Sequence, residues 1–326
     1  MDKRVLFCVL LLILQSVSPT LLYARSVGTT GAQFLEIYPG ARATGMGGAF
    51  GAVEGDIYAS YWNPAGLSSI PEPQVSATHI VWLESFSYNL LTYAQPVSDL
   101  VTVGGSVICF DGDDMARDKD MNELGEFGIR DLAGIVSTSY RITTRSSMGL
   151  NIKLISRKIG YQVARGMALD FGFRYNLFNS ENTPVKSIPR LTLGICVQNI
   201  GRGLKFIRKR ECLPLNVKYS VAFYLRDSRC LIAADMNVPL RSRVSYCVGL
   251  EYKIGSHFFF RYGLLMGGGY PETFVSRAGF GIHQGYGRLD YAYEYLGELG
   301  MIHRLTYTLD FSLAPSPPPI FTSTVK

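Results

Sequence analysis

The chain has 326 residues, of which 47% are hydrophobic and 18% are charged, with a formal net charge of +6. That charge is modest and spread along the chain, so it does not form the single basic face expected of a nucleic-acid-binding protein. The length allows one large domain or two. The high content of glycine, tyrosine and phenylalanine (34, 20 and 18 residues) favours an all-β fold.

The N-terminus has the pattern of a secretory signal peptide. Lys3 and Arg4 are followed by an apolar run at residues 5–14 and then by small residues up to Ala24, which is the order of regions found in signal peptides. We therefore predict that residues 1–24 direct export. No later stretch has the roughly 18–20 uninterrupted apolar residues of a membrane-spanning helix, so the sequence does not predict a helical membrane protein.

The cysteines after residue 24 do not predict a disulfide framework or a metal site. Their number is odd and none are closely spaced, and the absence of a C-x-x-C pair argues against zinc. Four of the five fall in predicted strands, where cysteine behaves as a small buried hydrophobe. The five are Cys109, Cys196, Cys212, Cys230 and Cys247.

Residues 40–67, GARATGMGGAFGAVEGDIYASYWNPAGL, are rich in glycine and alanine. Small side chains let two backbones approach closely, and glycine adopts backbone angles that other residues avoid. The segment has too little apolar surface to fold alone, so we expect residues 25–73 to pack inside something larger. Pro64 fixes a local bend. Arg42 is expected to pair with a carboxylate of the enclosing structure or with a ligand carboxylate.

The chain from residue 74 onward alternates apolar and polar residues with period 2, the pattern of β-strands with one apolar face. In 304–313, for example, Leu305, Tyr307 and Leu309 alternate with Arg304 and Thr306. A Pro-rich tail, 314–326, follows the last strand. The predicted strands number fourteen: 74–83, 86–96, 100–110, 128–141, 146–158, 164–178, 189–200, 214–226, 229–238, 243–254, 256–264, 274–284, 286–296 and 302–313.

Two architectures compete for these strands, a soluble sandwich and an outer-membrane barrel. A sandwich of this size would divide into domains, and no linker is visible. Connections after even-numbered strands are mostly tight, as at 96–99 and 143–145, whereas several after odd-numbered strands are long. An even strand count, turns of unequal length at the two ends and strands of about 9–11 residues are typical of outer-membrane barrels. The sequence therefore favours a barrel of about fourteen strands.

Two stretches resemble the FadL-like outer-membrane barrels, within them the PorV/PorQ-type branch. The first is the 40–67 segment with its closing Asn-Pro-Ala-Gly-Leu. The second is RAGFGIHQGYGRLDYAYEYLGELGMIHRLTYTLDF near the C-terminus. The resemblance implies a fourteen-stranded barrel whose N-terminal segment enters the lumen as a hatch. It also implies passage of long-chain fatty acids or other hydrophobic molecules, or, for PorV-like members, a role as partner in protein secretion or surface attachment.

The candidate site residues lie in the hatch and on the predicted lumen face of the strands. The hatch is either a gate or a static plug, and alternation places charges of both signs inward, either as ion pairs between strands or as carboxylate-binding cations. The hatch candidates are Gly40, Ala41, Arg42, Gly45, Met46, Gly47, Gly48, Asn63, Pro64, Ala65 and Gly66. The candidate ligand contacts are Lys153, Arg174, Lys218, Arg277, Arg288 and Arg304. The other inward charges are Asp170, Asp235, Glu251, Lys253, Asp290, Glu294 and Asp310.

The sequence predicts neither an enzyme nor a cofactor. His79, His257, His283 and His303 are far apart, and no Gly-x-Ser-x-Gly elbow occurs. We expect His303 to form a lumen or rim hydrogen bond. The acidic stretch 111–123 lacks the spacing of an EF-hand and is expected to be a solvated loop.

We therefore predict an outer-membrane channel for hydrophobic molecules, most directly long-chain fatty acids, gated by the N-terminal hatch. The alternative is a PorV-like, non-enzymatic outer-membrane adaptor for protein secretion or surface attachment. The expected partners are outer-membrane lipid, a hydrophobic ligand such as a fatty acid, and secretion-system or surface proteins.

Overall fold

The computed structural model describes residues 30–84, 86–118, 120, 122–177, 190–206, 209–225, 229–268 and 274–311. The predicted signal peptide (1–24) and C-terminal tail (314–326) lie outside the described residues.

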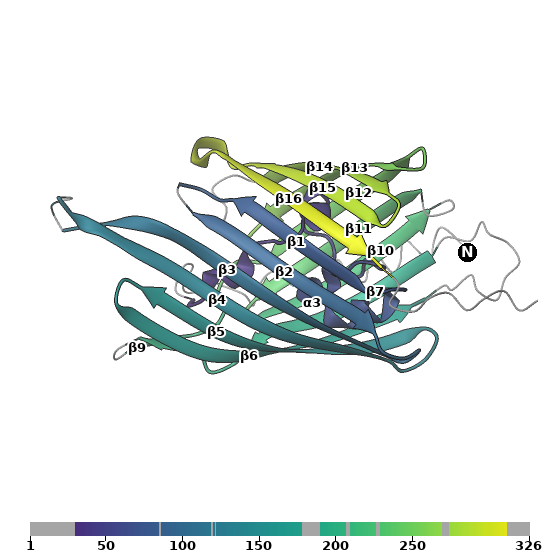
Figure 1. Ribbon diagram of the computed structural model, residues 1–326, viewed down its shortest axis with the longest axis horizontal. Coiled ribbons are helices and arrows are strands. Elements are labelled where there is room, and N and C mark those ends of the chain that lie inside the picture. Colours follow the sequence, from purple (N-terminus) through teal and green to yellow (C-terminus); the bar gives the residue numbers. More distant parts are fainter. Residues whose placement is uncertain are drawn as a thin grey trace, which may run out of the picture.

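Fourteen antiparallel strands close into one barrel, with β1 paired to both β2 and β16 (Figure 1). The predicted all-β, fourteen-stranded fold is confirmed. A two-stranded sheet of β8 (Leu204–Phe206) and β9 (Lys209–Glu211) lies in the connection between β7 and β10. The barrel strands are β1 Gln74–Val81, β2 Ser87–Pro96, β3 Val101–Arg117, β4 Glu123–Arg141, β5 Ser146–Ile159, β6 Gln162–Asn176, β7 Arg190–Ile200, β10 Asn216–Leu225, β11 Cys230–Pro239, β12 Ser245–Ile254, β13 Phe258–Gly267, β14 Phe274–Gln284, β15 Gly287–Tyr295 and β16 Met301–Asp310.

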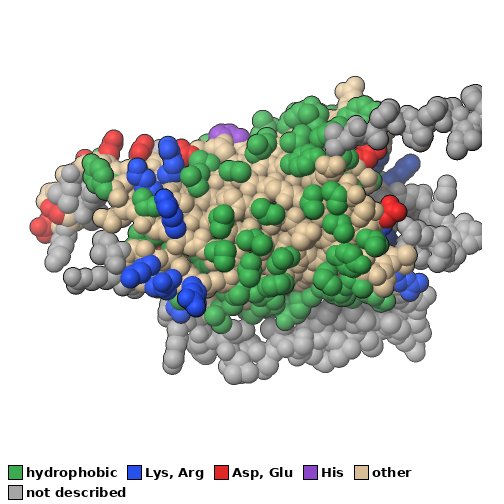
Figure 2. All heavy atoms as spheres, turned by 60° about the horizontal axis from the view of Figure 1, so that its bottom comes forward, with side chains coloured by type: hydrophobic (Ala, Val, Ile, Leu, Met, Phe, Trp, Pro, Cys, Tyr) green, Lys and Arg blue, Asp and Glu red, His purple; other side chains and the backbone are tan. Residues whose placement is uncertain are grey.

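The wall turns its apolar face outward and its polar face inward. On β16, Leu305, Tyr307 and Leu309 are exposed, whereas Arg304 and Thr306 are buried in the lumen. Hydrophobic side chains are spread over the outer surface (Figure 2). This arrangement is the reverse of a soluble protein and suits a wall that faces lipid.

The two ends of the barrel differ. At one, which we call the tight-turn end, lie the short β2–β3 and β4–β5 connections together with the start of β1 and the end of β16. At the other, the long-loop end, strands β3–β6 extend beyond their neighbours, on the left in Figure 1.

The prediction of a solvated loop at residues 111–123 was wrong for most of that stretch. Asp111 to Arg117 complete β3, and Glu123 begins β4. The backbone ladder continues through these acidic residues, with Asp111 opposite Arg130. Beyond the lipid both faces of a hairpin are hydrated, so charged residues do not interrupt it. The strands are therefore longer than apolar alternation predicts.

The N-terminal segment fills the lumen. It forms η1 (Gln33–Glu36), α2 (Ala41–Gly45), α3 (Ala59–Trp62) and η2 (Pro64–Ser69). Near the long-loop end the Gly31 amide donates to the Cys212 carbonyl (2.8 Å). Near the tight-turn end Arg141 donates to the Ser68 carbonyl (2.7 Å). The segment thus runs through the barrel and covers its cross-section.

Most of the hatch is shielded from solvent. Of residues 40–68, all except Arg42, Glu54 and Gly55 are buried. Within the described part of the chain, no helix is long and apolar enough to cross a membrane.

The outward orientation of the apolar face predicts a position-dependent cost for charge. Val136 lies midway along the outer face of β4 and is 66% exposed. Val136→Arg should lower the free energy of unfolding by about 2–4 kcal/mol, the cost of a cation near the bilayer midplane. Tyr161→Arg, in the turn between β5 and β6, should change it by less than about 0.5 kcal/mol. Urea unfolding in liposomes measures both, and equal effects would contradict the lipid-facing assignment.

Candidate functional site in the barrel lumen

The hatch touches the wall at two pairs of glycines, which we call the wall glycine pairs. Gly149 of β5 and Gly172 of β6 lie directly opposite each other in the ladder. A Cβ atom on Gly149 would meet the backbone of Pro64 and Ala65, and one on Gly172 would meet the Asn63 side chain, in both cases closer than real Cβ atoms approach. The Asn-Pro-Ala turn therefore rests directly on the wall backbone.

The second wall glycine pair is formed by Gly249 of β12 and Gly263 of β13, which are also directly opposite. Cβ atoms there would collide with the backbone of Met46 and Gly47. Gly47 itself has a φ of +70°, which favours glycine. Small residues are thus required on both sides of each contact.

Asn63 ties the two halves of the hatch to β6. Its Nδ2 donates to the Gly51 carbonyl (2.9 Å) and the Phe173 carbonyl (3.3 Å), and its Oδ1 accepts the Ala65 amide (3.2 Å). The neighbouring Trp62 ring is buried under the Lys218 ammonium, 4.9 Å from the ring centroid. Asn63 was predicted as a hatch residue, and its placement gives it a positioning role.

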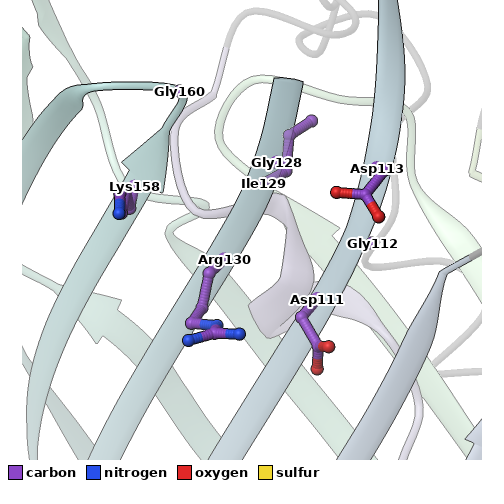
Figure 3. Close-up of a pocket in the computed structure, with 8 residues that line it drawn as sticks. All are labelled: Asp111, Gly112, Asp113, Gly128, Ile129, Arg130, Lys158 and Gly160. Carbon is purple, nitrogen blue, oxygen red and sulfur yellow. The ribbon is translucent and has the colours of Figure 1, made fainter. Parts of the chain in front are cut away.

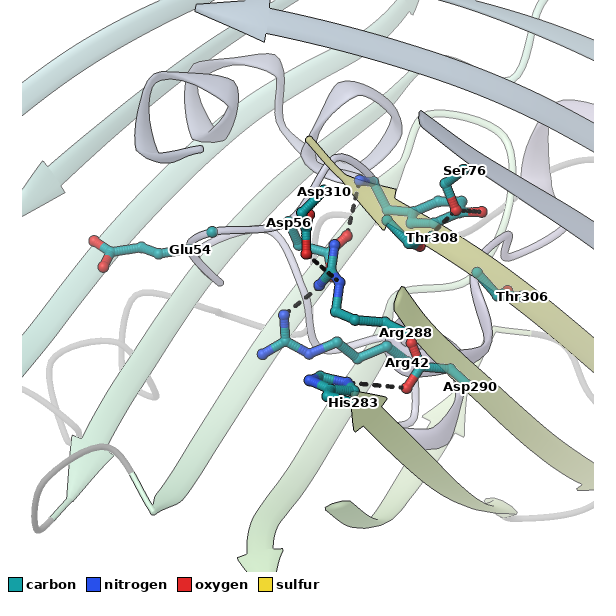
Figure 4. Close-up of polar contacts among 12 residues, drawn as sticks. Arg42, Glu54, Asp56, Ser76, His283, Arg288, Asp290, Thr306, Thr308 and Asp310 are labelled. Carbon is teal, nitrogen blue, oxygen red and sulfur yellow. Dashed lines mark hydrogen bonds and ion pairs between the residues drawn. The ribbon is translucent and has the colours of Figure 1, made fainter. Parts of the chain in front are cut away.

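Arg42 lies at the centre of a charge network in the lumen (Figure 4). Its Nε and Nη2 donate to both Glu251 oxygens (2.8 and 2.7 Å), and its Nη1 donates to Asp56 (3.0 Å). Arg261 bridges Glu251 (2.6 Å) and Asp290 (2.7 Å). Burial would lower the pKa of Arg42, but the carboxylates of Glu251 and Asp56 raise it well above its usual range. Of the two predicted partners for Arg42, the structure shows the lumen carboxylate.

Asp56 joins this network to the tight-turn end. Arg288 lies 3.5 Å from Asp56 and 3.4 Å from Asp310. Tyr58, two residues after Asp56, bonds to the hydroxyls of Ser76 and Thr78 on β1. Burial raises the pKa of Tyr58 to about 12, so its phenol keeps the proton that these bonds share.

The other predicted ligand contacts are also paired with protein carboxylates. Each lies on the lumen face of a strand, as alternation predicts, and none is free to meet a ligand without exchanging its partner. The pairs are Lys153–Asp170 (2.8 Å), Arg174–Glu54 (3.6 Å), Lys218–Asp235 (3.6 Å), Arg277–Glu294 (2.6 Å) and Arg304–Glu294 (2.7 Å).

Sequence reasoning missed two features of the lumen. Arg261 is fully buried, but it follows three phenylalanines that obscure the alternation of β13. The wall glycine pairs were also missed. Their signal is a glycine at a polar-face position between two outward apolar residues, as in Val248-Gly249-Leu250.

The expected position of His303 was wrong. It faces outward on β16 and bonds to the Tyr291 hydroxyl (2.7 Å), because residue 302 takes the inward position. Among the described residues, no group of three or more His, Cys, Asp or Glu side chains could hold a metal ion.

Two cavities lie on opposite sides of the hatch. The cavity at the long-loop end has a volume of about 360 Å³ and combines apolar residues with polar ones. The cavity at the tight-turn end has a volume of about 620 Å³ and is lined by Glu54, Arg190, Arg288 and Asp310. Arg190, which was not predicted, pairs with Glu54 (2.9 Å). Closure between the cavities depends on the hatch.

The wall glycine pairs predict that one methyl group is enough to disturb the hatch. Gly263→Ala would place a Cβ against the backbone of Gly47. We expect about 1–3 kcal/mol of destabilisation from overpacking, together with a larger single-channel conductance in planar bilayers. Gly134→Ala, on the outer face where a Cβ meets open space, is the matched control. Equal behaviour of the two variants would contradict the contact.

The Arg42 network predicts a large effect of removing its shared carboxylate. Glu251→Gln leaves two buried guanidinium groups without their anion, which should lower the free energy of unfolding by about 3–5 kcal/mol. The exposed Glu72→Gln should change it by less than about 0.5 kcal/mol. Denaturant unfolding measures both, and a loss below about 1 kcal/mol for Glu251→Gln would rule out the network as a major contributor.

Comparison with known proteins places the chain in a family. A profile of the uncharacterised protein family UPF0164 matches residues 20–233, and no curated protein sequence matches the chain. The fold is similar to three solved structures. The toluene transporter TodX of Pseudomonas putida is 13% identical, with 84% of this chain and 98% of that chain covered and a TM-score of 0.61. The toluene transporter TbuX of Ralstonia pickettii is 14% identical, with 84% and 98% covered and a TM-score of 0.60. A FadL homologue of Pseudomonas aeruginosa is 12% identical, with 84% and 99% covered and a TM-score of 0.59.

At these identities the similarity concerns the fold, and it confirms the resemblance to FadL-like barrels; the PorV/PorQ-type branch stays a prediction. The chain belongs to the uncharacterised protein family UPF0164 and has the FadL-like barrel fold.

Proposed function

We propose that this protein is an outer-membrane channel for hydrophobic molecules, most directly long-chain fatty acids, with the N-terminal hatch as its gate. The observation that carries the proposal is the cavity at the long-loop end, because the hatch itself forms part of its lining. Leu35, Tyr38 and Tyr61 of the N-terminal segment meet Pro214 and Leu215 of the wall there. Solved barrels of this fold include a toluene transporter and a monoaromatic hydrocarbon channel.

The cavity suits an amphipathic molecule better than a hydrocarbon. Its apolar side chains are joined by Asn237, Arg241 and Arg243, and a guanidinium group binds a carboxylate through two parallel hydrogen bonds. A fatty acid would therefore place its chain against the tyrosines and its carboxylate toward the arginines. Of the six lumen cations predicted as ligand contacts, Arg288 lines a cavity, the one at the tight-turn end.

Passage requires the hatch to move, and this movement is testable by cross-linking. The Ala41 amide donates to Thr306 Oγ1 of β16 (2.9 Å). In a variant whose native cysteines are replaced by alanine, Ala41→Cys/Thr306→Cys joined by a short reducible cross-linker should lower fatty-acid uptake into proteoliposomes at least tenfold. Reduction should restore the uptake.

The control for that experiment joins two wall residues and leaves the hatch free. Thr92 and Ser106 face each other inside the barrel on β2 and β3. Thr92→Cys/Ser106→Cys should take up fatty acid equally well before and after cross-linking. Uptake that is unaffected by the hatch cross-link would overturn the gate.

One observation favours the adaptor alternative. The hatch is held by buried ion pairs from Arg42 and by the Asp235 carboxylate, which accepts the Phe50 and Gly51 amides (3.1 and 2.9 Å). A plug held in this way, beneath hairpins that extend beyond the barrel, suits a static platform for other proteins. If the reconstituted channel takes up no fatty acid while a stable protein is recovered with it from its own membrane, the adaptor is the better account.

A further inference from the structure

The outer wall of β3–β5 changes from apolar to charged within two outward-facing rows. Val107, Gly134 and Leu154 lie side by side in one row on the three strands. Two rows further toward the long-loop end, Asp111, Arg130 and Lys158 lie side by side in the same way. Lys and Arg side chains gather toward this end of the face drawn in Figure 2. The step marks the level at which lipid acyl chains give way to headgroups.

A small cavity opens on the charged side of this step. It has a volume of about 300 Å³, and its lining includes Asp111 and Asp113 of β3, Arg130 of β4 and Lys158 of β5 (Figure 3). Gly128, which also lines it, leaves room between the charged side chains. The acids and bases are thus segregated onto neighbouring strands within one depression.

The two cations are placed where they repel each other. Arg130 and Lys158 are directly opposite in the β4–β5 ladder, and like charges in that position are destabilising. Neither side chain forms a hydrogen bond or ion pair with any residue that the structure describes. An anionic group lying between them would remove the repulsion.

An apolar notch lies below the charged cavity. Gly134 faces outward with open space where a side chain would be, and its neighbours Val107 and Leu154 are 56% and 63% exposed. Four residues separate Arg130 from Gly134, which is about 13 Å along a strand. The wall therefore offers charges at headgroup level and a recess at acyl-chain level in one line.

We propose that this surface binds one phospholipid whose zwitterionic headgroup carries a phosphate and a primary amine, as phosphoethanolamine does. The phosphate lies between Arg130 and Lys158, and the ammonium lies against Asp111 and Asp113. An acyl chain fills the notch at Gly134. Neighbouring strands are about 4.8 Å apart, which is comparable to the separation of phosphate and ammonium across a two-carbon linker. The proposal is independent of the channel function.

The test is competition among three lipids that share acyl chains and differ in headgroup. The full-length protein, purified in detergent, is mixed with equal amounts of phosphatidylethanolamine, phosphatidylglycerol and phosphatidylcholine, and bound lipid is counted by native mass spectrometry. We expect at least a fivefold preference for phosphatidylethanolamine. The glycerol headgroup has no ammonium, and the choline ammonium has no hydrogen to donate.

Matched variants separate the parts of the site. Asp111→Asn/Asp113→Asn should reduce the preference to less than twofold while phospholipid still binds. Arg130→Gln/Lys158→Gln should lower binding of all three lipids, and Gly134→Leu should do the same without altering charge. Arg145→Gln, an exposed cation in the β4–β5 turn at the tight-turn end, should leave binding unchanged. Heat-modified electrophoretic mobility confirms that each variant is folded.

Two results would overturn the proposal. One is a wild-type protein that shows no headgroup preference or prefers phosphatidylglycerol. The other is a preference for phosphatidylethanolamine that survives in both charge variants, since annular lipid would then account for the binding.

Discussion

The width of the lumen is the constraint on which the rest of the structure depends. A barrel of about eight strands can be filled by the side chains of its own wall, and wider barrels enclose a space that the wall cannot fill. In this fourteen-stranded barrel the space is occupied by residues 40–68. Backbone lies against backbone at the wall glycine pairs, so a segment built from glycine and alanine fits where larger side chains would not.

The same constraint explains the charges of the lumen. A polar interior that is closed to bulk water must satisfy its ions internally, because a buried charge without a partner is costly. Arg42 and Glu54 of the hatch meet Glu251 and Arg190 of the wall, so hatch and wall neutralise each other. Breaking one buried pair costs about 3–5 kcal/mol. Any opening of the hatch must therefore exchange these partners for water or ligand.

Much of the fold could be predicted from the sequence, because period-2 alternation reports directly which face of a strand is apolar. The β3–β4 hairpin extends past residue 111 because hydrated strands do not need an apolar face, and alternation is silent there. The pairing of Arg42 with Glu251 could not be predicted in detail. It depends on the strand register and on the path of the hatch, and local sequence specifies neither. The wall glycine pairs depend on register in the same way.

The central claim is that residues 40–67 are folded inside the barrel and bonded to its wall. Hydrogen exchange of the protein in detergent, followed residue by residue, measures this directly, since buried and bonded amides exchange only when the structure opens. The account predicts that the amides of Thr44, Gly48 and Asn63 exchange as slowly as those of the central barrel strands. Exchange of these amides as fast as that of the exposed turn at Tyr161 would contradict it.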